Sequence, residues 1–173
     1  VSYGQEQKVG TYLETEGIEV LLPKCKKQKT YRGVKKLVEV SLIPNALFVH
    51  STAEILKQYI GKAPTENLHH FYVPHRDEKG RAIGSGRRPI IIPDIQMQSF
   101  LIWLNADNQD KIFINTVDFE YKNNDLVRIT DGEFKGFTGH VVRLKGQTRV
   151  GITLDGFGFV STAYIPRGLL EKI

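Results

Sequence analysis

The chain has 173 residues, of which 40% are apolar and 25% are charged, a composition typical of folded proteins that argues against intrinsic disorder. The net charge of +5 suits contact with an anionic surface, such as nucleic acid or an acidic protein face, and does not decide between the two. No stretch approaches the roughly 18 apolar residues that a membrane span needs, and we recognise no signal peptide, so we expect no membrane association.

The first part of the chain, up to about Lys111, mixes predicted helices and strands. Val9, Tyr12 and Leu13 fall at i, i+3 and i+4 and predict a helix over residues 6–16, which Gly17 ends. Further along we expect strands over 18–22, 34–41 and 46–50, a helix over 54–60 capped by Ser51 or Thr52, a strand-like stretch over 69–74, turns at 78–80 and 84–86, and a helix that starts at Pro93 with Asp94 as its N-cap. This order predicts an α+β domain with an antiparallel sheet and helices packed on it.

The second part, from Asn124 to Ile173, changes to short β runs separated by glycine. The expected strands are 126–130, 138–144, 149–154 and 159–164, with Asp-Gly or Lys-Gly turns between them. Short strands at this spacing predict a small all-β barrel. We therefore place one domain over residues 1–112, a linker over 113–122 and a barrel domain over 123–173.

Basic residues concentrate in one segment around Tyr31, which predicts a charged hairpin that contacts the phosphates of nucleic acid. A hairpin kept soluble by its charge is an equal alternative. Arg87 and Arg88, beside glycines, are a second candidate phosphate contact, although the segment lacks the Lys-Ser/Thr of a nucleotide-binding loop. The candidate nucleic-acid-binding residues are Lys24, Lys26, Lys27, Lys29, Arg32, Lys35, Lys36, Arg87 and Arg88.

The sharpest motif runs from Asn124 to Val142 and resembles the KOW motif of NusG proteins and some ribosomal proteins. Its glycines, Gly132, Gly136 and Gly139, suit a chain that doubles back tightly between two strands. Phe134, Lys135 and Phe137 in the loop are candidate partner contacts, and the alternative is that the two aromatics plug the barrel mouth. The resemblance implies an SH3-like barrel that contacts a ribosomal protein or the termination factor Rho. We expect it to remain β, because Val, Ile, Thr and Gly dominate residues 141–164.

The first part resembles the N-terminal domain of the same NusG family. Residues 3–9 are similar to the start of its first helix, 17–23 to its second strand, and 42–49 to a strand that ends in an aromatic facing RNA polymerase. Ala46 stands where the family commonly has a second aromatic, and the family's leading strand would precede the first residue given, so we expect a truncated first strand. The segment 90–97 and the short linker are closer to specialised paralogues, of which Bacteroides-type regulators of surface-polysaccharide operons are the nearest group.

The resemblance implies a monomeric transcription elongation or antitermination factor that binds the clamp helices of RNA polymerase. Phe48, Met97 and Leu101 would form an exposed apolar patch with Tyr3 at its rim, unless these side chains are buried core. The basic hairpin would reach the non-template DNA strand. Whether the factor suppresses or promotes termination stays open.

The sequence offers two alternatives to this function. An RNA-binding, ribosome-associated KOW protein fits the second part but would not need a strand with an outward Phe48. An enzyme is disfavoured, because no catalytic set of side chains emerges from the sequence. We expect no cofactor and no metal: Cys25 is the single cysteine, which also favours the cytoplasm, and His69, His70 and His75 cluster without any Cys-x-x-Cys pair.

Overall fold

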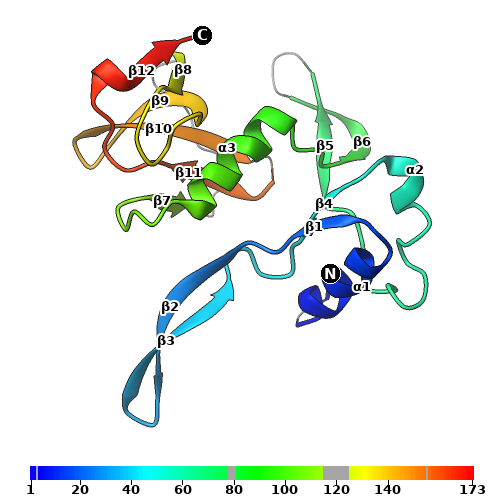
Figure 1. Cartoon of the computed structure of the whole chain (residues 1–173). Coiled ribbons are helices and arrows are strands. Elements are labelled where there is room, and N and C mark those ends of the chain that lie inside the picture. The colour runs from blue at the N-terminus through cyan, green and yellow to red at the C-terminus, as the bar shows by residue number, and fades with distance from the viewer. Residues whose placement is uncertain (3, 78–80, 115–124, 155) are drawn as a thin grey trace. The chain divides into compact units, whose positions relative to one another are not determined.

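The computed structural model describes residues 1–2, 4–77, 81–114, 125–154 and 156–173. It forms two compact units, Val1–His70 and Phe71–Ile173 (Figure 1). By packing, the chain thus divides after His70, earlier than the boundary expected near residue 112.

The first unit contains the predicted helices and strands, most of them somewhat shorter than expected. Its elements are α1 (Glu6–Thr15), β1 (Glu19–Leu21), β2 (Lys24–Tyr31), β3 (Val34–Ser41), β4 (Phe48–His50) and α2 (Ala53–Leu56). Gly17 follows α1 with a φ of 78°, which confirms it as the helix stop. The Thr52 hydroxyl accepts a hydrogen bond from the Ile55 N–H and so caps α2, but that helix ends at Leu56 rather than at residue 60.

One face of α1 builds the core of the first unit. Val9 and Leu13 are buried together with Ile18 and Leu68, and half-buried apolar side chains from β1 and β4 pack against this cluster. β1 pairs antiparallel with β4, which places Leu21 opposite Phe48. The helical period read from the sequence therefore identified the face of α1 that the fold buries.

The strands of the N-terminal part form small separate sheets rather than one continuous sheet. β1 pairs with β4, β2 pairs with β3, and β5 (Tyr72–Arg76) pairs with β6 (Ala82–Pro89), each pair a two-stranded sheet. The α+β class is as expected, and the single antiparallel sheet is not found among the described residues.

The second unit differs from the sequence-based expectation at β6 and at the start of α3. The turn expected at 84–86 lies inside β6, where Gly84 has a φ of 61° and the pairing with β5 shifts register between Pro74 and Arg76, so these glycines mark an irregular strand. α3 (Asp94–Asn105) has Pro93 at its N-cap and no side-chain cap, so Asp94 is the first helical residue. The turn expected at 78–80 lies outside the described residues.

The rest of the second unit is a six-stranded antiparallel sheet in the order β12-β8-β9-β10-β11-β7. Its strands are β7 (Ile112–Ile114), β8 (Leu126–Ile129), β9 (Thr138–Leu144), β10 (Gln147–Leu154), β11 (Gly158–Ser161) and, after the short 3₁₀ turn Arg167–Leu169, β12 (Leu170–Lys172). The all-β barrel and its β character are confirmed, and β12 was not predicted. Phe113 and Ile114, assigned to the linker, belong to a strand that pairs with β11; residues 115–122 lie outside the described part.

Both faces of the sheet are covered, since the buried Phe159 and Val160 are neighbours on β11 and project to opposite sides. Among the described residues of this part of the chain, six large apolar side chains are completely buried. They are Ile129, Phe137, Val150, Leu154, Phe159 and Val160. Two glycines stand where a side chain would not fit: a Cβ on Gly151 would overlap the Phe159 ring, and one on Gly139 would lie 2.5 Å from the Gly151 carbonyl oxygen. Among the described helices of the chain, none combines the length and the apolarity that crossing a membrane requires.

The close contact at Gly151 gives a testable prediction. Gly151→Ala should lower the free energy of unfolding by about 1–3 kcal/mol, because the new methyl group overpacks a closed core. The chain has one tryptophan, Trp103 in α3, so urea denaturation followed by tryptophan fluorescence reports on the second unit. Gly168→Ala is the matched control, since nothing lies within 4 Å of its added Cβ, and we expect a change within about 0.5 kcal/mol. Equal transitions for both variants would contradict the tight packing.

Candidate functional site

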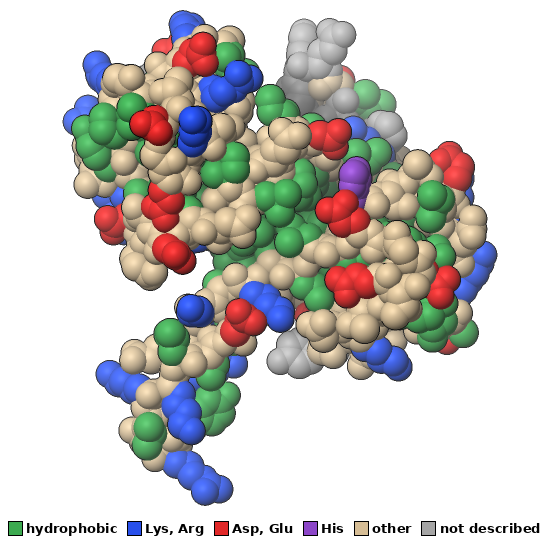
Figure 2. All heavy atoms as spheres, in the orientation of Figure 1, with side chains coloured by type: hydrophobic (Ala, Val, Ile, Leu, Met, Phe, Trp, Pro, Cys, Tyr) green, Lys and Arg blue, Asp and Glu red, His purple; other side chains and the backbone are tan. Residues whose placement is uncertain are grey.

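The most strongly charged feature of the first unit is the hairpin of β2 and β3, residues 24–41, which we call the basic ribbon. It pairs in one uninterrupted register from Lys24 opposite Ser41 to Tyr31 opposite Val34, and it turns at Arg32 and Gly33, both at positive φ. Figure 1 shows the ribbon extending away from α1, β1 and β4, and Figure 2 shows Lys and Arg side chains along it. The seven basic residues predicted here lie on the ribbon and are exposed: Lys24, Lys26, Lys27, Lys29, Arg32, Lys35 and Lys36.

One ion pair is found within the basic ribbon. Lys24 Nζ lies 3.4 Å from Glu39 Oε2, and both side chains are about half exposed, at 47% and 58%. An exposed pair of this kind adds little to stability. The charge of the ribbon is thus available to a partner rather than needed by the fold.

Arg87 and Arg88 lie on β6 in the second unit and are both exposed. They pair with Pro74 and Val73 respectively. As neighbours on one strand, they project to opposite faces of the hairpin, so they do not form a joint clamp on one phosphate.

The apolar patch expected for polymerase contact is not present as predicted. Phe48 is 8% exposed, so the expectation of an exposed aromatic at this position is wrong. Because successive strand residues alternate between faces, Phe48 lies on the face of the β1–β4 pair opposite to Val49, whose side chain packs against the α1 cluster. Tyr3 lies outside the described residues. Phe48 belongs to the first unit, and Met97 and Leu101 belong to the second.

Met97 and Leu101 lie on one flank of α3, where they are half-buried and 36% exposed respectively. Their i, i+4 spacing places them one above the other, and Leu104 continues the same strip at i+7. We call Met97, Leu101 and Leu104 the α3 flank. It is the part of the expected patch that the fold leaves accessible.

The opposite side of α3 packs on the barrel and forms hydrogen bonds with it inside an apolar interface. We call this packing the seat of α3. The buried Ser99 hydroxyl donates to the Thr138 carbonyl and accepts from the Thr138 N–H, at 2.9 Å each. Trp103 Nε1 donates to the Ser161 carbonyl at 2.9 Å, and Phe100 stacks beside Trp103. The contacts of Ser99 and Trp103 with the barrel were not predicted from the sequence. Their signal was a serine and a tryptophan at i, i+4 within the apolar stripe of the helix.

Lys111 closes the C-terminal end of α3. Its ammonium group donates to the carbonyls of Trp103 and Leu104, at 2.8 and 3.1 Å, and lies 4.8 Å from the centre of the Trp103 ring. A cation there satisfies carbonyls that the helix leaves unpaired and complements the helix dipole. Burial lowers the pKa of Lys111, while Glu133 and Asp107 act in the opposite direction.

The aromatics of the KOW-like loop plug the barrel rather than face solvent. Phe134 is 3% exposed and Phe137 is fully buried, so the expectation that they are exposed for a partner is wrong and the structural alternative holds. The loop folds back through a hydrogen bond from the Gly136 N–H to the Ile129 carbonyl at 2.8 Å, which directs both rings inward. Lys135, between them, is exposed.

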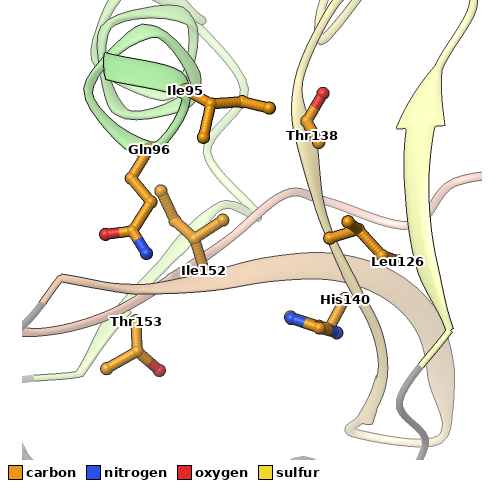
Figure 3. Close-up of a pocket in the computed structure, with 7 residues that line it drawn as sticks. All are labelled: Ile95, Gln96, Leu126, Thr138, His140, Ile152 and Thr153. Atoms are coloured by element: carbon orange, nitrogen blue, oxygen red, sulfur yellow. The ribbon is translucent and has the colours of Figure 1, made fainter. Parts of the chain in front are cut away.

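A cleft of about 310 Å³ lies between α3 and the barrel. Figure 3 shows Ile95 and Gln96 on α3 facing side chains from β8, β9 and β10. The cleft is lined by Ile95, Gln96, Leu126, Thr138, His140, Ile152 and Thr153. In the part of the chain that is described, no group of three or more His, Cys, Asp or Glu side chains comes together.

The seat of α3 gives a second prediction. Ser99→Ala should lower the free energy of unfolding of the second unit by about 1–3 kcal/mol, because it leaves the buried Thr138 N–H without its acceptor. Urea denaturation followed by Trp103 fluorescence measures the change. Gln98→Ala, at an exposed position of the same helix, should stay within about 0.5 kcal/mol of the wild type. A Ser99→Ala transition that coincides with that of Gln98→Ala would show that the seat does not stabilise the unit.

Comparison with protein families matches both parts of the chain. Residues 1–101 match the family model described as transcription termination factor nusG, and residues 123–155 match the KOW motif. The first match covers the basic ribbon and most of α3, and the second covers the barrel from β8 to β10. The two matches stand in the order expected from the sequence and together cover most of the chain, which therefore belongs to the NusG family of transcription factors.

Proposed function

We propose that this chain is a non-enzymatic transcription elongation or antitermination factor that binds RNA polymerase through its N-terminal domain and recruits a partner through its KOW domain. The observation that carries the proposal is the pair of family matches, NusG over residues 1–101 and KOW over 123–155, in a single chain. NusG-family members generally interact with RNA polymerase. The proposal includes neither a cofactor nor a metal, and it places the factor in the cytoplasm as a monomer.

The α3 flank is the proposed contact with the clamp helices of RNA polymerase. Leu101 is 36% exposed, and Met97 beside it is half-buried. Methionine and other large apolar side chains at an accessible helix surface are typical of protein interfaces. This flank replaces the wider patch predicted from the sequence, because Phe48 is buried.

The remaining surfaces suit the other proposed partners. The basic ribbon carries seven exposed cations and supports a contact with the non-template DNA strand. For the KOW domain, Lys135 is the exposed member of the predicted trio, so a contact with a ribosomal protein or with Rho would use it rather than the two buried phenylalanines.

Binding to purified core RNA polymerase tests the proposal. The wild-type chain should bind, and Leu101→Ala should weaken binding by about 1–2 kcal/mol, typical of an interface anchor. Ile55→Ala is the matched control, because Ile55 in α2 is a similarly exposed branched side chain, at 42%, and we expect its affinity to be unchanged. Urea denaturation of both variants checks that the folds are intact.

A different outcome would favour the runner-up function. If the wild-type chain does not bind polymerase but binds ribosomal RNA or ribosomes, the chain is a ribosome-associated KOW protein. If it binds polymerase and Leu101→Ala behaves like Ile55→Ala, the polymerase contact lies elsewhere than on the α3 flank.

A further inference from the structure

The pairing register divides the basic ribbon into two chemically different faces. Residues directly opposite each other in an antiparallel pair project to the same side, and successive residues alternate between sides. One face, which we call the mixed face, carries Lys24, Lys26, Gln28 and Thr30 from β2 with Lys35, Leu37, Glu39 and Ser41 from β3. The other, which we call the lysine face, carries Cys25, Lys27, Lys29 and Tyr31 from β2 with Val34, Lys36, Val38 and Val40 from β3.

On the mixed face, a carboxylate balances the lysines. Glu39 stands directly opposite Lys26 and forms the ion pair with Lys24 at 3.4 Å. An anion approaching this face would meet the charge of Glu39 and would compete with it for the ammonium groups. The mixed face is therefore the less favourable side of the ribbon for phosphate.

On the lysine face, two ammonium groups oppose each other. Lys29 pairs directly with Lys36, and Lys27 stands two residues before Lys29, about 6.7 Å along the strand. Like charges directly opposite in a sheet destabilise the pairing. All of residues 24–41 are described, and none of them places a carboxylate on this face. A bound polyanion would reduce the repulsion between Lys29 and Lys36, which no carboxylate on this face of the ribbon offsets.

The same face ends in an accessible aromatic ring. Tyr31 is 53% exposed and stands opposite Val34, which is 57% exposed, at the last pair before the turn. A cationic track leading to an exposed aromatic is the arrangement with which proteins hold single-stranded nucleic acid, where phosphates meet the cations and a base stacks on the ring. In a duplex the base faces are already stacked on one another, so Tyr31 would find no base face to cover.

We propose that the lysine face binds a single-stranded segment of nucleic acid, with Lys27, Lys29 and Lys36 on its phosphates and Tyr31 stacked on one base. The inference deepens the nucleic-acid contact of the proposed function and rests on it. The mixed face contributes only diffuse attraction.

Fluorescence anisotropy with the full chain and a labelled mixed-sequence oligonucleotide tests the inference. Four arms use single-stranded DNA, single-stranded RNA and the duplex of each, over a range of salt concentrations. The wild-type chain should bind the single strands more tightly than the duplexes, and the DNA and RNA arms identify which single strand is preferred. Tyr31→Ala should weaken single-strand binding by about 5- to 150-fold, the worth of one stacked base, and Tyr31→Phe should bind within about twofold of the wild type.

Two double variants remove the same charge from opposite faces. Lys29→Gln with Lys36→Gln should reduce the slope of log K against log salt by about 1.4, since each phosphate contact to a single strand contributes about 0.7. Lys26→Gln with Lys35→Gln, on the mixed face, should change the slope by less than half as much. Lys29→Arg with Lys36→Arg keeps both charges and should bind like the wild type. The substituted side chains are exposed, and thermal unfolding of each variant checks the fold.

Three results would overturn the inference: equal loss from the two Lys→Gln double variants, unchanged binding by Tyr31→Ala, or duplex binding as tight as single-strand binding. No polymerase is present in this assay, so its failure is separate from that of the proposed function. If the chain binds polymerase through Leu101 but the two double variants lose binding equally, the proposed function stands and the lysine-face proposal is wrong.

Discussion

The seating of α3 on the barrel is the interaction on which the second unit depends. Ser99 hydrogen-bonds to both the N–H and the carbonyl of Thr138, and Trp103 donates to the Ser161 carbonyl. Side chains of one helix thus pair with backbone groups of two strands inside an apolar interface. A buried backbone group without a hydrogen-bond partner costs folding free energy. A helix whose side chains supply such partners is therefore held in one position on the strands. Lys111 then closes the end of the same helix and leads into β7, which pairs with β11.

This seat decides which side of α3 can meet another molecule. Because Ser99, Phe100 and Trp103 face the barrel, the accessible side is the one that carries Leu101. The NusG match ends at residue 101, within α3, while the helix packs on strands β9 to β11. Most of α3 thus belongs to the NusG match, but the helix packs in the same unit as the KOW motif. Its buried side serves stability, and its outer flank is free to serve recognition.

The basic ribbon obeys a different constraint. A two-stranded hairpin buries little apolar surface and is only marginally stable alone, so its composition contributes little to the core. The hydrogen bond from the Leu42 N–H to the Pro23 carbonyl, at 2.8 Å, closes the base of the ribbon, where buried residues begin. Along β2 and β3, twelve of the sixteen residues are exposed, and the four half-buried ones lie toward the base: Cys25, Val38, Val40 and Ser41. Lys29 and Lys36 are exposed, so no core contact requires these two like charges to stand opposite each other.

The local signals in the sequence determined much of this protein. The period of Val9 and Leu13 gave the buried face of α1, Gly17 ended that helix, and the glycine-punctuated β runs after residue 124 gave the barrel. These features follow from short-range geometry, which neighbouring residues specify. The gathering of seven cations on one hairpin was likewise readable from their order along the chain.

Only the tertiary structure decided which side chains are covered and which share a face. The sequence shows that three phenylalanines are apolar, but not whether they are buried: Phe48, Phe134 and Phe137. Their burial depends on strands and loops distant in sequence. The seat of Ser99 and Trp103 depends on strands 39 and 58 residues away. The lysine face exists only in the observed register, since a slip of one residue would change which lysines of β3 stand beside those of β2. The sequence by itself determined the helices and strands and the charge they carry. Long-range pairing, which no local pattern encodes, decided which side chains form the exposed surfaces.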